Sequence, residues 1–347
     1  MTYHSPLADL YQRKFTLDYS GTLDDILTEL EHPDVETRAL HPPRIIRAAI
    51  DHKIRSPSHE AEQLVRHAID AALNVYRHEY SSAGARFRTH IQIDGLDDLL
   101  AQPIRQPDDS VTRDATHPQR SQKTAERIAQ QAPGDILFIA LAHGGVAAGM
   151  DVYLRHCEAF GENSIFYAVR LSTQKICDAQ PQLSFTELNY LRSQAVGRQV
   201  VIFDEDKASG TTLSIANRYF QRIFPHKDIL IVYNLGMLEE LAHAGIAINT
   251  NFDPPNKKSF HTFIKETYHE YALFGPGLSP EKFTENGPLI IPEMKKGNRS
   301  HFDLSYVLSV SPSDADHLVK ISPIIGKNYN ADYPDVYKIL NKQMPFT

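Results

Sequence analysis

Residues 200–212 read VVIFDEDKASGTT, and this stretch decides which fold the chain can adopt. The run QVVIFD at 199–204 is short and apolar, as in a strand that is buried on both faces of a sheet. A charged loop follows, and a segment with helical periodicity then continues until Pro225 stops it. A loop that joins the carboxyl end of a parallel strand to a helix is where α/β proteins bind ligands. The stretch therefore predicts an α/β fold with a ligand site at this loop.

The loop KASGTT at 207–212 has the chemistry of a phosphate site. Free backbone N–H groups would point at one spot there, and the dipole of the following helix favours an anion. Gly210 allows close approach of the phosphate, and the neighbouring hydroxyl groups add donors. Asp204 and Glu205 would repel the same phosphate, so we expect them to accept hydrogen bonds from two vicinal sugar hydroxyls. A magnesium ion nearby would offset the negative charge.

Short apolar runs alternate with helical segments over about 120–250, which predicts a mostly parallel sheet with helices on both faces. We expect strands at 135–142, 164–170, 199–204 and 228–233. We expect helices at about 121–132, 147–160, 185–194, 211–224 and 236–244.

The flanking segments differ in character from this α/β unit. Before it, the apolar spacing of 61–76 predicts a helix capped by Ser56 with Pro57 in its first turn, and Pro42-Pro43 reads as a break. After it, the chain is irregular, with alternation at 302–310 that predicts one strand. We therefore expect three regions: a mainly helical N-terminal region, an α/β core and an irregular α+β C-terminal extension that would form a hood for the acceptor, at 1–118, 119–250 and 251–347.

A second glycine-containing loop precedes the first by about 60 residues. The expected strand at 135–142 runs into His143, Gly144 and Gly145. Paired glycines let a backbone turn its N–H groups onto a diphosphate, where a Cβ would collide. Alone, this HGG sequence is more often an ordinary turn, and a histidine there is more often a loop residue than a catalytic base. The position of the HGG sequence before the acidic loop favours the interpretation that it binds a diphosphate.

The two loops, in this order, resemble those of type I phosphoribosyltransferases, whose motif is a hydrophobic strand, two acidic residues, a variable stretch, and then a small residue, Gly and Thr. The resemblance covers about 120–250. It implies that Asp204 and Glu205 hold the ribose of the sugar diphosphate PRPP, and contact Mg²⁺ mainly through ligand and water. It also implies that the pyrophosphate is bound by His143, Gly144 and Gly145. The remaining residues that it assigns to PRPP are Asp206, Lys207, Ala208, Ser209, Gly210, Thr211 and Thr212.

The same resemblance implies an enzyme that transfers 5-phosphoribosyl from PRPP to a nitrogen acceptor, a nucleobase or a related heterocycle or amine, and releases pyrophosphate. The family has a flexible basic loop over the diphosphate, and here that stretch offers Arg170 and Lys175 as catalytic cations beside Asp204 and Glu205. A solvated loop charge is an equal interpretation of Lys175. Asn234 and Leu235, at the end of the next expected strand, are candidate acceptor contacts.

Three residues of the first loop depart from the family pattern. Asp206 and Lys207 stand where members commonly carry aliphatic residues, and Ala208 stands where purine-salvage members carry an acidic proton acceptor. Two alternatives therefore remain: a PRPP- or nucleotide-sensing regulatory protein without catalysis, and a phosphoribosyl or nucleotide hydrolase. A Ser-Gly-Thr loop after a strand also occurs in flavin mononucleotide sites.

Composition narrows the class of protein further. The chain has 347 residues and a formal net charge of −7, which disfavours a general electrostatic interaction with nucleic acid or an anionic membrane. Its two cysteines, Cys157 and Cys177, are too few for a disulfide framework or a zinc site. No window approaches the roughly 20 apolar residues of a membrane span, and the first residues are polar, so we expect a cytoplasmic protein of nucleotide metabolism. An exposed sheet edge would permit a homodimer.

Overall fold

The computed structural model describes residues 3–78, 80–161, 163–173, 178–208 and 210–243, together with Lys265 and Tyr268. The strand expected at 302–310 and most of the expected C-terminal extension lie outside these residues. The chain divides into two compact units. They are Met1–Asp206 with Gly210–Leu235, and Lys207–Ser209 with Gly236–Thr347.

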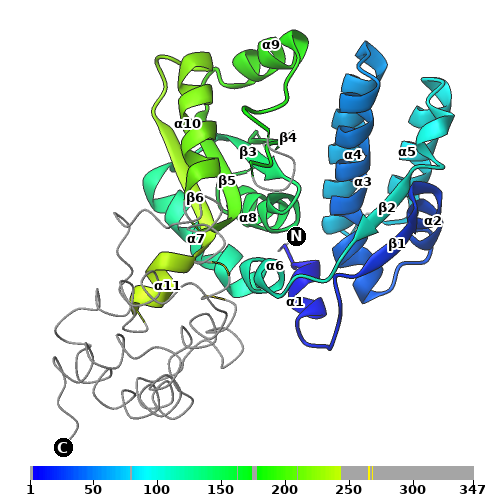
Figure 1. Ribbon diagram of the computed structural model, residues 1–347, viewed down its shortest axis with the longest axis horizontal. Helices are drawn as coiled ribbons and strands as arrows, with labels where there is room; N and C mark the ends of the chain where they lie inside the picture. The colour runs from blue at the N-terminus through cyan, green and yellow to red at the C-terminus, as the bar shows by residue number, and fades with distance from the viewer. Residues whose placement is uncertain are drawn as a thin grey trace, which may run out of the picture. The chain divides into compact units, whose positions relative to one another are not determined.

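The first unit contains a four-stranded parallel sheet with the order β4-β3-β5-β6, flanked by helices (Figure 1). The strands are β3 (Ile136–Ala142), β4 (Ile165–Arg170), β5 (Gln199–Lys207) and β6 (Ile229–Gly236). All seven residues of β3 are buried, and Phe138 pairs with Phe166 on one side and with Val201 on the other. The four expected strands are confirmed, and β5 continues three residues further than expected, through the acidic segment.

Helices alternate with these strands as the periodicity predicts. They are α7 (Pro118–Gln131), α8 (Gly145–Phe160), α9 (Phe185–Gln194), α10 (Thr211–Ile223) and α11 (Met237–His243). From β3 the chain runs through α8 to β4 on one side, and then through α9 to β5 on the other side of β3. The order of the strands thus reverses between β3 and β5. The loops that leave their carboxyl ends flank the crevice where open α/β sheets bind ligands.

The N-terminal region is mainly helical, as expected. Its helices are α1 (Pro6–Leu10), α2 (Leu23–Glu29), α3 (Val35–Arg55), α4 (His59–Tyr76), α5 (Tyr80–Ile93), a 3₁₀ turn η1 (Asp97–Leu99) and α6 (Ser110–Ala115). The region also contains a small antiparallel sheet, which the sequence did not indicate, of β1 (Tyr19–Thr22) and β2 (Pro103–Gln106). Both strands are only four residues long, which is too short for a clear alternation.

Two expected helix boundaries in this region were wrong. Helix α4 is capped by Ser58, whose Oγ accepts from the Ala61 backbone N–H at 3.0 Å, and not by Ser56. Helix α3 continues through Pro42 and Pro43, where we expected a break. A proline at 43 cannot bond the carbonyl of Ala39, four residues earlier. That carbonyl instead accepts from the hydroxyl of the buried Tyr76 at 2.8 Å, so α4 supplies the missing donor.

One hydrophobic core extends from the N-terminal helices into the sheet, with buried residues from Leu23 to Val232. Helices α3 and α4 pack against β4 and α8. The change in sequence character near residue 118 therefore does not coincide with a break in the core.

A buried ion pair ties α3 to the sheet. Lys53 Nζ lies 2.7 and 2.9 Å from the two carboxylate oxygens of Glu187 in α9, and the hydroxyl of Tyr167 in β4 donates to the same carboxylate at 2.6 Å. All three side chains are buried. Burial, and then the charge of Glu187, raise the pKa of Tyr167 well above its ordinary value, so the phenol keeps the proton that it donates.

We expect Lys53→Ala to lower the free energy of unfolding by about 3–5 kcal/mol, because it leaves the Glu187 charge buried without its partner. Denaturant unfolding measures this loss. Arg113→Ala is the control, since it breaks an ion pair with Asp108 that is more than one-third exposed on both sides, and should cost at most about 1 kcal/mol. The double variant Lys53→Met/Glu187→Gln should recover part of the loss. A cost for Lys53→Ala no larger than that of the control would contradict the prediction.

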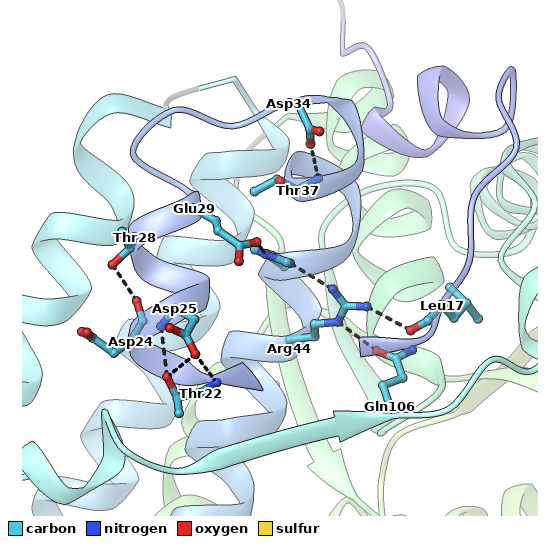
Figure 2. Close-up of polar contacts among 11 residues, drawn as sticks. Leu17, Thr22, Asp24, Asp25, Thr28, Glu29, Asp34, Thr37, Arg44 and Gln106 are labelled. Carbon is cyan, nitrogen blue, oxygen red and sulfur yellow. Dashed lines mark hydrogen bonds and ion pairs between the residues drawn. The ribbon is translucent and has the colours of Figure 1, made fainter. Parts of the chain in front are cut away.

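A second polar network joins α3 to the small sheet (Figure 2). The guanidinium of Arg44 donates to Gln106 Oε1, to the backbone oxygen of Leu17 and to His41 Nδ1, each at 3.0 Å. It also lies 4.3 Å from the centre of the Tyr19 ring. Since His41 Nδ1 accepts from Arg44, the proton of the neutral ring sits on Nε2, which lies 2.5 Å from Glu29 Oε2. Burial lowers the pKa of Arg44 to about 10, and it stays charged at neutral pH.

Several histidines in the described part of the chain are held neutral by their surroundings. Burial is the largest influence in each case and lowers the pKa below 6.5 at His41, His52, His67, His117 and His156. The unfolded chain then binds more protons than the folded one. The stability that these groups contribute is complete above about pH 6.5 and is lost as the pH falls through their folded-state pKa values.

We therefore expect the free energy of unfolding to fall between about pH 7 and pH 5.5. His41→Gln should reduce that slope by up to about 1.4 kcal/mol per pH unit, because one proton fewer is taken up on unfolding. Urea titrations at a series of pH values measure both slopes. Equal slopes for the variant and the wild type would show that His41 plays no part.

Candidate functional site

The two glycine loops meet at the point where the order of the strands reverses. Gly144 follows β3, and a Cβ built on it would lie 1.6 Å from Oε1 of Glu205, near the end of β5. A Cβ on Gly145 would lie 3.5 Å from Glu205 Oε2 and 3.6 Å from Asp204, which is ordinary contact. The peptide between Ala142 and His143 is cis. The structure thus brings the expected pyrophosphate loop against the expected ribose-binding pair.

Both helices that leave this edge begin without a capping side chain. Helix α8 has Gly144 at its N-cap, and α10 has Gly210 there with φ of 74°, a left-handed conformation that favours glycine. Helices α2, α3, α4, α6, α7 and α9 are capped by a side chain, from Thr22, Asp34, Ser58, Asp109, His117 and Ser184 respectively, whereas the short α1 is not. Helix α8 also starts two residues earlier than expected, so the backbone of Gly145 and Val146 belongs to its first turn. Two helix N-termini with glycine caps suit anionic groups.

The segment after β4 reaches the start of α10. Thr173 Oγ1 lies 2.9 Å from Oγ1 of Thr212, in the first turn of α10. Arg170, at the end of β4, pairs with Asp178 at 3.2 Å, and Asp178 also accepts from the Ser172 backbone N–H at 2.9 Å. Arg170 therefore holds its own loop as well as lying near the expected pyrophosphate site. Lys175 lies outside the described residues.

Asp51 is a site residue that was not expected from the sequence. It comes from α3, and its Oδ1 lies 3.1 Å from His143 Nε2 and 3.9 Å from Arg170 Nη1. Arg47, one turn earlier, approaches Oδ2 at 3.8 Å. Burial would raise the pKa of Asp51, but the hydrogen bond from His143 and the nearby cations outweigh it, so the pKa lies below its ordinary value. Nothing in the sequence IRAAIDHKIR separates this aspartate from any other charged helix residue.

The other expected residues of the acidic loop lie as follows. Asp204, Glu205 and Asp206 are partly buried at the carboxyl end of β5. In the second unit, Lys207 donates to Glu239 Oε1 at 2.8 Å, and Ala208 is buried. Ser209 lies outside the described residues.

Asn234 and Leu235, the expected acceptor contacts, are engaged within the fold. Asn234 Nδ2 donates to the backbone oxygen of Ala115 at 2.9 Å and to Ser121 Oγ at 3.1 Å, which ties β6 to the end of α6 and to the first turn of α7. Leu235 is fully buried. The side-chain nitrogen of Asn234 therefore already donates two hydrogen bonds within the fold.

Carboxylates dominate the described part of the site. The carboxylates Asp51, Asp178, Asp204 and Glu205 are set against two guanidinium groups, those of Arg47 and Arg170. An anionic ligand at the two helix N-termini would need a cation to accompany it. Among the described residues no group of three His, Cys, Asp or Glu side chains could hold a metal ion alone. Any metal here would take most of its ligands from the bound molecule and from water.

Comparisons of the chain with protein-family models, with curated proteins and with solved structures find no match. In the part of the chain that the structure describes, none of the helices combines the length and apolar character needed to cross a membrane.

We expect Gly144→Ala to destabilise the protein by about 1 kcal/mol or less, because the new methyl group must displace the Glu205 carboxylate, which is the end of a flexible side chain. Gly145→Ala is the matched control on the next residue, where the added Cβ meets only ordinary contacts. Thermal unfolding of both variants, and of Gly144→Ala/Glu205→Ala, measures the effect. The double variant should regain stability relative to Gly144→Ala, and additive losses would contradict the contact.

Proposed function

We propose that the chain is a phosphoribosyltransferase, which transfers 5-phosphoribosyl from PRPP to a nitrogen acceptor and releases pyrophosphate. The observation that carries the proposal is the approach of Gly144 to Glu205, which joins the two loops at one edge of the sheet. PRPP has a diphosphate and a 5'-phosphate on either side of a ribose. The site offers two helix N-termini on either side of an acidic pair.

Each part of the ligand then has a group of matching chemistry. The 5'-phosphate would accept from backbone N–H groups and hydroxyls at the start of α10, where Gly210 permits close approach. Asp204 and Glu205 would accept from the two ribose hydroxyls. The diphosphate would lie at the HGG loop and the start of α8. Fixing the ribose between these groups aligns its anomeric carbon with the nucleophile, so most of the catalysis comes from orientation and charge stabilisation.

Magnesium fits the acidic surroundings of this site. Asp204 and Glu205 are the residues that would contact the ion, mainly through water and the ligand. The ion would supply positive charge that offsets the phosphates. The chain's own carboxylates would make PRPP without a divalent cation a poor ligand, because they repel its phosphates.

Ala208 favours a second candidate function on the same site, a PRPP-sensing protein without catalysis. The residue is buried and has no group that could accept a proton from the nucleophile. Release of pyrophosphate from PRPP across a panel of nucleobases and amines supports the enzyme. Binding without release supports the sensor, and release without any acceptor supports a hydrolase.

Titration calorimetry with Mg-PRPP tests the proposal. We expect saturable binding, and a loss of affinity of at least about tenfold in Asp204→Asn and in Glu205→Gln, because each removes a charged acceptor for a ribose hydroxyl. Asp228→Asn is the control, since that carboxylate directly precedes β6, at the amino ends of the strands and away from the candidate site at their carboxyl ends. The absence of binding by the wild type at millimolar Mg-PRPP would refute the proposal.

A further inference from the structure

His143 has one ring nitrogen with a partner and one without. Nε2 lies 3.1 Å from the Asp51 carboxylate, which can only accept, so Nε2 carries a proton. Nδ1 is buried and has no hydrogen-bond partner among the residues that the structure describes. A buried polar atom without a partner is costly, and such atoms are rare in native proteins. The position of His143 in the HGG loop indicates what its partner would be.

A diphosphate offers oxygens that accept hydrogen bonds. To bond one of them, Nδ1 must carry a proton as well, and the ring is then an imidazolium. The Asp51 carboxylate at Nε2 balances that charge. A hydrogen bond from a charged donor to a phosphate oxygen is about twice as strong as a neutral one.

The surroundings of the pair are charged on each side. From α3, Arg47 approaches the second oxygen of Asp51, and from β4, Arg170 approaches the first. From β5, Glu205 lies against Gly144, next to His143. Asp51 remains ionised in this setting, as its lowered pKa indicates. Helix α3 is also held by the buried pair of Lys53 and Glu187, so the position of Asp51 is determined by packing.

We propose that Asp51 is a positioning residue, which fixes the imidazole of His143 through Nε2 so that Nδ1 donates a hydrogen bond to the diphosphate expected at the HGG loop. The proposal rests on the proposed function and adds a group from the N-terminal region to the site. It also gives the HGG loop a charged donor beside the backbone N–H groups of its glycines.

Two substitutions of His143 separate the roles of its two nitrogens. The amide nitrogen of asparagine falls near the position of Nδ1, whereas that of glutamine falls near the position of Nε2. We expect His143→Gln, which keeps only the Asp51 contact, to weaken binding of Mg-pyrophosphate at least about tenfold. His143→Asn keeps a neutral donor toward the ligand and should weaken it by only about threefold. A purely structural role through Asp51 would give the opposite order.

Asp51→Asn tests the positioning residue. Its amide oxygen can still accept from Nε2, but it no longer balances an imidazolium, so binding of Mg-pyrophosphate should weaken about tenfold. Glu36→Gln, at an exposed acidic residue of the same helix, is the matched control. Ribose 5-phosphate is the second probe, and its affinity should be unchanged in all of these variants because it lacks the diphosphate.

Calorimetry with Mg-PRPP, Mg-pyrophosphate and ribose 5-phosphate distinguishes the outcomes. If the wild type binds Mg-PRPP but the Asp51 and His143 variants bind Mg-pyrophosphate as the wild type does, the pair has no role and the proposed function stands. If the wild type binds Mg-PRPP and not Mg-pyrophosphate, the same losses are expected for Mg-PRPP, and unchanged Mg-PRPP affinity in the variants shows that the pair has no role. Equal losses of both part-ligands in the variants also show that the pair has no specific role. If the wild type binds none of the three, the proposed function and the role of the pair both fall.

Discussion

The burial of β3 is the constraint on which the rest of the structure depends. Every residue of this strand is buried, so it needs a neighbour along each edge and cover on each face. Strands β4 and β5 supply the two edges, and the connections between them force the chain to cross from one side of β3 to the other. That crossing brings the ends of β3 and β5 together, and with them the HGG loop and the acidic pair. The site is in this sense a consequence of how the strand is covered.

The N-terminal helices take part in the same packing. Helices α3 and α4 pack on β4 and α8, and their apolar faces join the core of the sheet. Asp51 reaches the site because α3 lies where this packing requires it. Since Lys53 pairs with Glu187 on another side of the helix, α3 is held at two points. A region that the sequence separates from the α/β core therefore contributes both to its stability and to the candidate site.

The sequence predicted the α/β core well because its signals there are local. Apolar runs, glycine and threonine in the loop after β5, and Pro225 after α10 each act within a few residues. The predictions were wrong or incomplete where a residue far away in the sequence determines the local structure. Pro42 and Pro43 read as a break, but the hydroxyl of Tyr76 provides a donor for the carbonyl that Pro43 leaves without one. Asp51 was missed for the same reason, because its partners lie about 90 and 120 residues further along the chain.

The pairing of Lys53 with Glu187 also has a consequence for how the chain folds. The two residues are 134 positions apart, so α3 is synthesised long before its ionic partner and before the strand on which it packs. Contacts of such high sequence separation form late and slowly. Until β4 and α9 emerge, the apolar sides of α3 and α4 have no sheet to cover. The newly made N-terminal half then exposes apolar surface of the kind that leads to aggregation or to chaperone binding.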